Sequence, residues 1–97
     1  MFELLSEKCA RGRKVLFSLE AAPGHVAAVA GSFNDWDPTA TPMKYDPVSQ
    51  SYSAVIELIP GDYEYKFVLD GEWLLDEANP GFFHNDFGTL NSVLKVD

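Results

Sequence analysis

The feature that most constrains this chain is the dipeptide Asp70-Gly71, which stands between two runs of strand-forming residues, 63–69 and 72–75. Asp-Gly in this setting predicts a β-hairpin closed by a two-residue type I′ turn, in which both turn residues take a positive φ. A chain whose clearest local signal is a hairpin is expected to fold around antiparallel sheets.

A two-residue turn also fixes which residues of the two strands face each other. Counting outward from the turn, the predicted pairs are Leu69 with Glu72, Val68 with Trp73, Phe67 with Leu74, and Lys66 with Leu75. Directly opposed residues share a face of a sheet. One face, with Tyr65, Phe67, Leu69 and Leu74, is therefore predicted to join the core, and the other carries Lys66, Val68 and Trp73.

Further strands are predicted where Val, Ile, Phe and Tyr gather between turn formers, at residues 14–20, 25–30 and 92–96. A second hairpin is predicted from residues 43–45 and 51–59 around the turn at 46–50. In its second arm a period of two places Tyr52, Ala54, Ile56 and Leu58 on one face.

About seven short strands at this spacing predict one all-β domain, an immunoglobulin-like (early-set) β-sandwich over residues 14–97. Residues 1–13 are interpreted as a lead-in that is weakly helical at best, because Arg11-Gly12-Arg13 interrupts it. The stretch after residues 76–81, from 82 through 86, is expected to be irregular. The adjacent Phe82 and Phe83 are expected to point apart, leaving one exposed.

Charge and cysteine content limit the possible partners and compartment. Fifteen acidic against seven basic residues give a net charge of −8, which repels phosphate backbones and anionic lipids, so neither nucleic acid nor a membrane is expected as a partner. The single Cys9 cannot form an internal disulfide. Without a secretion signal or an apolar membrane span, we expect a cytoplasmic protein.

The sequence offers no catalytic or metal-binding pattern. His25, His84 and Cys9 lack the spacing of zinc ligands, and the aspartates lack that of a calcium loop. No glycine-rich phosphate loop or nucleophile elbow occurs. We therefore expect no cofactor, no metal and no enzymatic activity, and a small glycoside hydrolase is disfavoured because 97 residues scarcely provide a deep cleft.

A binding surface remains. Sugar rings expose patches of C–H bonds rimmed by hydroxyls, which proteins hold with aromatic platforms and flanking polar groups. Trp36, in the turn-rich segment 31–38, and Trp73 are candidate platforms, and Lys66 is a candidate donor. Phe33 and Asn34 are interpreted as structural residues of that segment, the ring buried beneath it and the amide bonded to its backbone.

Three stretches, residues 29–36, 60–73 and 87–92, carry a resemblance that spans nearly the whole chain from Lys14 onward. Their sequences are VAGSFNDW, PGDYEYKFVLDGEW and FGTLNS. On these words the chain resembles carbohydrate-binding module family 48, which includes the glycogen-binding domain of the AMP-activated protein kinase β subunit and the N-terminal domains of branching and debranching enzymes such as isoamylase.

The resemblance implies a non-catalytic module for α-glucan, such as glycogen or starch. It implies that Trp36 and Trp73 stack on glucose units and that Lys66, Thr89 and Asn91 contribute hydrogen bonds. Phe87 stands where the family usually has Leu, and it could stack on the glucan or block a ring-shaped one. The alternative is a β-sandwich that docks on a glycogen-metabolising enzyme or kinase without binding glucan. Glucan length, branching preference, oligomeric state and partner enzyme stay open.

Overall fold

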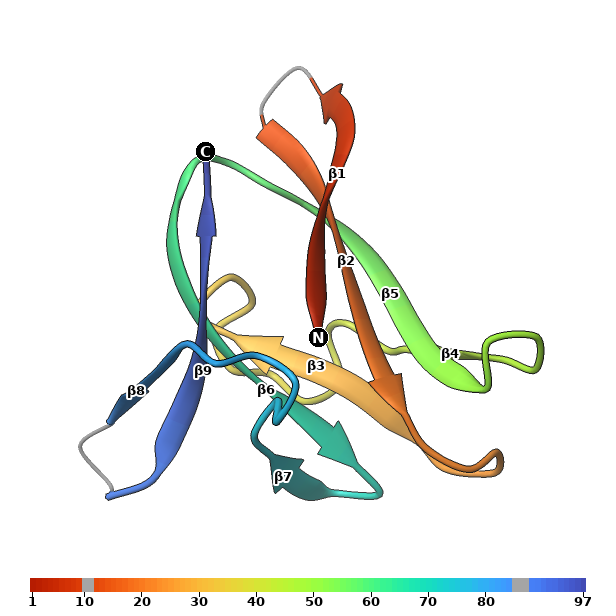
Figure 1. Ribbon diagram of the computed structural model, residues 1–97. Helices are drawn as coiled ribbons and strands as arrows, with labels where there is room; N and C mark the ends of the chain where they lie inside the picture. Colours follow the sequence, from red (N-terminus) through yellow and green to blue (C-terminus); the bar gives the residue numbers. More distant parts are fainter. Residues whose placement is uncertain (10–11, 85–87) are drawn as a thin grey trace.

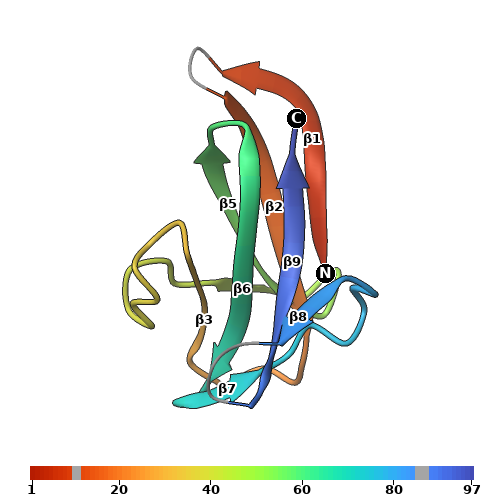
Figure 2. The same ribbon diagram turned by 90° about the vertical axis from the view of Figure 1, so that its left-hand side faces the viewer.

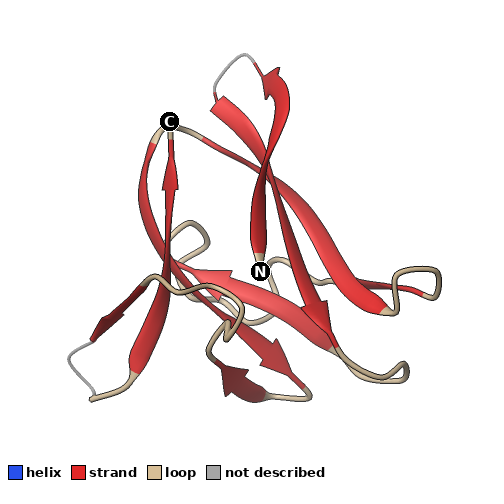
Figure 3. Ribbon diagram, in the orientation of Figure 1, coloured by secondary structure: helices blue, strands red, loops and turns tan. Residues whose placement is uncertain are grey.

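The computed structural model describes residues 1–9, 12–84 and 88–97, with side chains described for residues 1–5 and for the other two ranges in full. These residues form strands joined by loops and turns, without a helix (Figure 3). In chain order the strands are β1 (Phe2–Cys9), β2 (Gly12–Glu20), β3 (Ala27–Gly31), β4 (Lys44–Asp46), β5 (Ser51–Leu58), β6 (Gly61–Leu69), β7 (Glu72–Leu74), β8 (Phe82–His84) and β9 (Leu90–Val96).

The strands form two antiparallel sheets (Figure 1). The first sheet has the order β1-β2-β5-β4, and the second has the order β3-β6-β9-β8 with β7 paired to the end of β6. Figure 2 shows β6 and β9 running side by side, with β7 at the lower end of β6. The predicted all-β sandwich is confirmed, with nine strands among the described residues rather than about seven.

The core lies between the two sheets and is built by alternation along the strands. Phe17 of the first sheet meets Tyr65 of the second, with ring centroids 5.0 Å apart. Tyr65 also packs against Phe67, at 5.7 Å. The largest fully buried apolar side chains are those of Val15, Phe17, Val29, Tyr65, Phe67 and Leu94. Burial of such side chains is the main favourable contribution to folding.

Both predicted hairpins are present. The β6–β7 hairpin pairs Phe67 with Leu74, Val68 with Trp73 and Leu69 with Glu72, and its turn residues Asp70 and Gly71 have φ of 51° and 83°. Strand β7 ends at Leu74, so the predicted Lys66–Leu75 pair is not part of the ladder. In the β4–β5 hairpin the predicted face is confirmed: Tyr52 and Leu58 are buried, and Ala54 and Ile56 pack against the core.

The expectation for the first residues is wrong. Residues 2–9 form β1 rather than a weak helix, and β1 pairs with β2 at the edge of the first sheet. Phe2 and Leu4 lie opposite Phe17 and Val15 and pack against the core. Their spacing of two matches a strand with one buried face, and the neighbouring β2 supplies hydrogen-bond partners that a sequence pattern cannot reveal.

The expectation of irregular structure over residues 82–86 is also wrong in part, because Phe82–His84 form β8 at the edge of the second sheet. Phe82 and Phe83 do lie on opposite faces, since they oppose Ser92 and Asn91 of β9. Both rings are nevertheless exposed, at 56% and 57%, where one was expected to be. An edge strand of three residues has little structure on either side to cover them.

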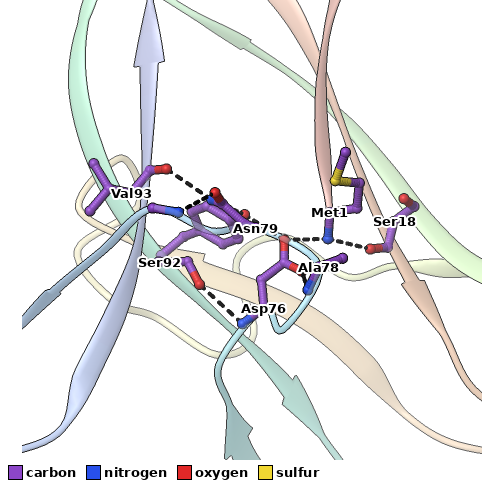
Figure 4. Close-up of polar contacts among 9 residues, drawn as sticks. Met1, Ser18, Asp76, Ala78, Asn79, Ser92 and Val93 are labelled. Atoms are coloured by element: carbon purple, nitrogen blue, oxygen red, sulfur yellow. Dashed lines mark hydrogen bonds and ion pairs between the residues drawn. The ribbon is translucent and has the colours of Figure 1, made fainter.

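A buried polar network holds the segment between β7 and β8 (Figure 4). The Tyr65 hydroxyl donates to the Asp76 carboxylate at 2.6 Å, and the terminal amine of Met1 pairs with the same carboxylate oxygen. Asn79 Nδ2 donates to the backbone oxygen of Val93, and the Asp76 N–H donates to Ser92 Oγ. Burial raises the pKa of Tyr65 well above its usual range, so this hydroxyl stays a donor.

Candidate functional site

The candidate site lies on the face of the second sheet that points away from the core, which we call the outer face. In β6 the core residues Tyr65 and Phe67 alternate with Glu64, Lys66 and Val68, which therefore lie on the outer face. The β3 residues Ala28 and Ala30 oppose Val68 and Lys66, and Trp73 of β7 opposes Val68 from the other side. The outer face thus extends over β3, β6 and β7.

Trp36 is delivered to this face by a tight loop after β3. Asn34 closes the loop: its Oδ1 accepts from the Gly31 N–H at 3.0 Å, and its Nδ2 donates to the Val29 oxygen and to Thr41 Oγ1. The structural role expected of Asn34 is therefore confirmed. The Trp36 N–H also donates to the Gly31 oxygen.

The same loop carries backbone strain at Trp36 itself and at the residue before it. Asp35 and Trp36 have φ of 58° and 57°, in the left-handed region that a bulky side chain seldom adopts. Such conformations cost about 1–3 kcal/mol each and gather at ligand-binding segments. Nearby, two hydrogen bonds from Thr39 lower the pKa of Asp37, so the carboxylate that closes the next turn remains ionised.

The Trp36 ring packs on a small second apolar cluster made by Ala28, Ala30 and Val68. The two alanines are short enough for an indole to lie over them, and Val68 is 6% exposed beneath the loop. Trp36 itself is half-buried. One indole therefore rests on the sheet while part of it stays open to solvent.

Trp73 reaches the same face from the other side of Val68. It is 40% exposed and lies directly opposite Val68 in the β6–β7 ladder, as the turn register predicted. The turn before it is anchored to the β2–β3 connection. Asp70 accepts from the Val26 N–H at 2.8 Å and contacts His25 Nδ1 at 2.5 Å, and these two bonds lower the pKa of Asp70.

The polar candidates meet next to these rings. Lys66 is half-buried, and its Nζ donates to Thr89 Oγ1 at 3.1 Å. Thr89 is exposed in the segment leading into β9. The predicted lysine and threonine are thus in direct contact, although 23 residues separate them in the sequence.

Asn91, which the resemblance implies as a hydrogen-bonding residue, is buried in this structure. It is 6% exposed, and its Nδ2 donates to Glu64 Oε1 at 3.1 Å. Asn91 therefore lies beneath the surface and fixes a carboxylate beside Lys66 on β6. Phe87 lies outside the described residues, so its role stays a prediction.

Glu64 and the floor formed by Ala28, Ala30 and Val68 were not among the sequence candidates. The signal for Glu64 was available, because a period of two from Lys66 and Val68 places it on their face. The turn register had placed Val68 on this face, but Ala28 and Ala30 could not be found in this way, since the floor depends on which strand lies beside β6 and on where the Trp36 loop folds back.

The arrangement is an open surface with two aromatic rings flanking Val68, an ammonium held by a hydroxyl, and a carboxylate held by an amide. Such groups can stack on an apolar ring face and exchange hydrogen bonds with hydroxyls. Within the described ranges no group of three His, Cys, Asp or Glu side chains is placed to hold a metal ion. No helix of the described chain is long and apolar enough to cross a membrane.

Comparison with known proteins identifies the family of this chain. A family model described as the glycogen recognition site of AMP-activated protein kinase matches residues 15–97. The chain belongs to this family. The resemblance to carbohydrate-binding modules is thereby confirmed, and the family is one of recognition domains.

Curated relatives of this glycogen-recognition chain are subunits of the same kinase. The chain is 27% identical over 94 residues to the Sus scrofa 5'-AMP-activated protein kinase subunit beta-1, covering 97% of this chain and 72% of that protein. It is 30% identical over 73 residues to the beta-2 subunits of Mus musculus and Homo sapiens, covering 75% of this chain. The match spans 26% of the mouse subunit and 25% of the human one.

Proposed function

We propose that this chain binds α-glucan, such as glycogen or starch, on the outer face of its second sheet and performs no catalysis. The observation that carries the proposal is the convergence of Trp36, Trp73 and Lys66 around Val68. Membership of a glycogen-recognition family supports the same ligand class.

In this proposal Trp36 and Trp73 each stack on the C–H face of a glucose unit. Stacking of this kind on nucleic acid bases is worth about 1–3 kcal/mol by alanine substitution, and we take the same scale for sugars. Lys66 donates to a sugar hydroxyl while Thr89 holds its ammonium. Asn91 acts together with Glu64, whose carboxylate it positions as an acceptor for sugar hydroxyls.

The charge of the chain fits a neutral polysaccharide. With a net charge of −8 the molecule attracts neither phosphates nor sulfates at long range. Recognition must then come from short-range contacts, which stacking and hydrogen bonds to hydroxyls supply. After the entropic cost of association, dissociation constants of roughly micromolar to millimolar follow.

The test is a calorimetric titration of maltoheptaose into the protein and into Trp73→Ala. We expect saturable binding that weakens by about tenfold or more in the variant. Val55→Ala is the matched control, because Val55 is also exposed, at 53%, but lies in the first sheet. Absence of binding to the unmodified protein up to millimolar sugar would rule the proposal out.

A partner protein is the second part of the proposal, since the relatives are named as subunits of a kinase. We propose that the chain, or a longer protein that contains it, brings a glycogen-metabolising enzyme or a kinase to the glucan in the cytoplasm. Co-purification of such an enzyme with the tagged chain, undiminished by Trp73→Ala, is the expected result. If the unmodified chain co-purified with such an enzyme but failed to bind maltoheptaose, docking alone would be the function.

A further inference from the structure

The outer face continues beyond Asn91 onto β8. Strand order in the second sheet places β9 next to β6 and β8 next to β9. Phe83 lies directly opposite Asn91 in the β8–β9 ladder, so the two side chains share a face. Asn91 in turn contacts Glu64, an outer-face residue of β6. Phe83 is therefore an outer-face residue, on the same surface as Lys66.

Phe83 is 57% exposed, and no ring contact involves it among the described residues. Its neighbour Phe82 is equally exposed, at 56%, but lies opposite Ser92 on the other face and contacts the His84 ring. A single exposed apolar residue needs no explanation. Phe83 is a different case, because it continues the row of aromatic and polar groups on the outer face and so extends that surface.

The separation suits a linear chain that runs across the strands. Neighbouring strands lie about 4.8 Å apart, so Phe83 is about 10 Å from the Lys66 position across two strand steps. A glucan lying over Trp36, Trp73 and Lys66 would reach β8 within roughly two further glucose units on that spacing. A shorter oligosaccharide would not reach it.

The segment that leads into β8 is also fixed, which lowers the entropic cost of using it. Asn79 Oδ1 accepts from the Gly81 N–H at 2.9 Å, and Asn79 Nδ2 donates to the Val93 oxygen of β9. The Val93 N–H donates back to the Gly81 oxygen at 3.2 Å. Gly81, the residue before β8, is thus held by the Asn79 side chain through its N–H and by β9 through its oxygen. Figure 4 shows Asn79 beside Val93 of β9.

We propose that Phe83 is an additional stacking platform, a subsite occupied by α-glucan chains too long to be held by the two tryptophans alone. This inference rests on the proposed glucan binding and adds a preference for chain length to it. The ligand presents its apolar ring face to the phenyl ring, which carries no polar group and so selects for a sugar face rather than for a particular hydroxyl.

The test measures affinity along a series of linear maltooligosaccharides, from maltotriose to maltodecaose, for the unmodified protein, Phe83→Ala and Phe82→Ala. Phe83→Ala is expected to weaken binding of maltodecaose by about five- to tenfold and to change that of maltotriose by less than about twofold. Phe82→Ala is the matched control, equally exposed but on the opposite face, and is expected to change neither. Phe83→Trp, which keeps an aromatic platform, is expected to retain the affinity for maltodecaose.

Three results would overturn the subsite. They are unchanged affinity of Phe83→Ala for maltodecaose, an equal loss at every chain length, and an equal loss in Phe82→Ala. If Phe83→Ala altered only the self-association of the free protein in sedimentation, β8 would be an interface between copies and the subsite would be wrong. Failure of the proposed function itself is distinguishable, because the unmodified protein would then bind no member of the series.

Discussion

At the scale of single residues, the contact between Lys66 and Thr89 raises the question of which residue bonds the glucan directly and which acts by positioning the other. Lys66→Met keeps the length of the side chain and removes its charge, and we expect about tenfold weaker binding of maltoheptaose, because hydrogen bonds to charged groups are worth about 1.5–3 kcal/mol. Thr89→Val removes the hydroxyl that the ammonium contacts. If Thr89 acts through Lys66, the double variant binds no more weakly than Lys66→Met, as calorimetry of all four proteins can establish.

Lys95→Met is the control for this cycle. Lys95 is exposed on β9, lies opposite Asp62, and is far along the strand from Asn91. Its loss changes the net charge as the loss of Lys66 does, so equal effects of the two substitutions would mean that the overall field, and not a local contact, is responsible.

Asp70 connects the turn before Trp73 to the β2–β3 connection, and its charge can be removed without changing the turn. Asn tolerates the positive φ of this position, so Asp70→Asn isolates the charge. Because the folded-state pKa of Asp70 lies below its ordinary value of 3.8, the carboxylate stabilises the fold above that pH, and this contribution is lost as the pH falls through the folded-state pKa. The expected result is a lower Tm for Asp70→Asn at about pH 7 and a difference that shrinks below about pH 4. A difference independent of pH would contradict it.

The residues of the candidate site differ in how far the sequence could place them. Trp73 and Lys66 follow from a two-residue turn, since the register leaves each with one possible face. Trp36 could be assigned to a loop but not to a position over Val68, because that packing depends on two alanines of β3. The burial of Asn91 could not be expected either, since it depends on Glu64 lying across a strand pair 27 residues away.

At the scale of elements, β1 is a strand that local signals do not predict, and its contribution to stability can be measured. Phe2 packs against the core with its ring centroid 6.2 Å from that of Tyr65. Removing a buried Phe side chain costs about 3–5 kcal/mol, and a half-buried one less, so we expect Phe2→Ala to lower the free energy of unfolding by about 1–3 kcal/mol. Urea denaturation gives this value directly.

Glu3→Ala is the matched control for β1. Glu3 is exposed and points away from Phe2 on the same strand, opposite Leu16 of β2. We expect its substitution to change stability by less than about 0.5 kcal/mol. Equal and small effects of both substitutions would mean that β1 pairs with β2 without contributing to the core.

The elements that sequence reasoning placed correctly are those whose partner is nearby in the chain. The β6–β7 and β4–β5 hairpins have turn residues that fix their register, so local chemistry suffices. Strands β1 and β8 are both at sheet edges and lack a strong alternation of their own. They exist because β2 and β9 each offer an unpaired edge to a segment that is adjacent in the chain, which is a property of the assembled sheet.

At the scale of the whole molecule, the charge of −8 leads to a prediction that separates glucan binding from protein docking. The proposed ligand is neutral and its contacts are short-range, whereas salt screens interactions beyond a Debye length of about 8–10 Å at physiological ionic strength. Affinity for maltoheptaose is therefore expected to change by less than about twofold between roughly 0.05 and 0.5 M NaCl.

A basic protein partner drawn to the acidic surface would instead lose affinity steeply over the same range, because steering between opposite net charges is what the added salt removes. Calorimetric titrations of maltoheptaose at several salt concentrations, with a neutral osmolyte as the control for water activity, measure the slope. A strong decrease in glucan affinity with salt would contradict a contact set built from stacking, one half-buried lysine and a carboxylate already held by an amide. Glucan affinity would then depend on the long-range electrostatic field of the molecule rather than on short-range contacts at the outer face.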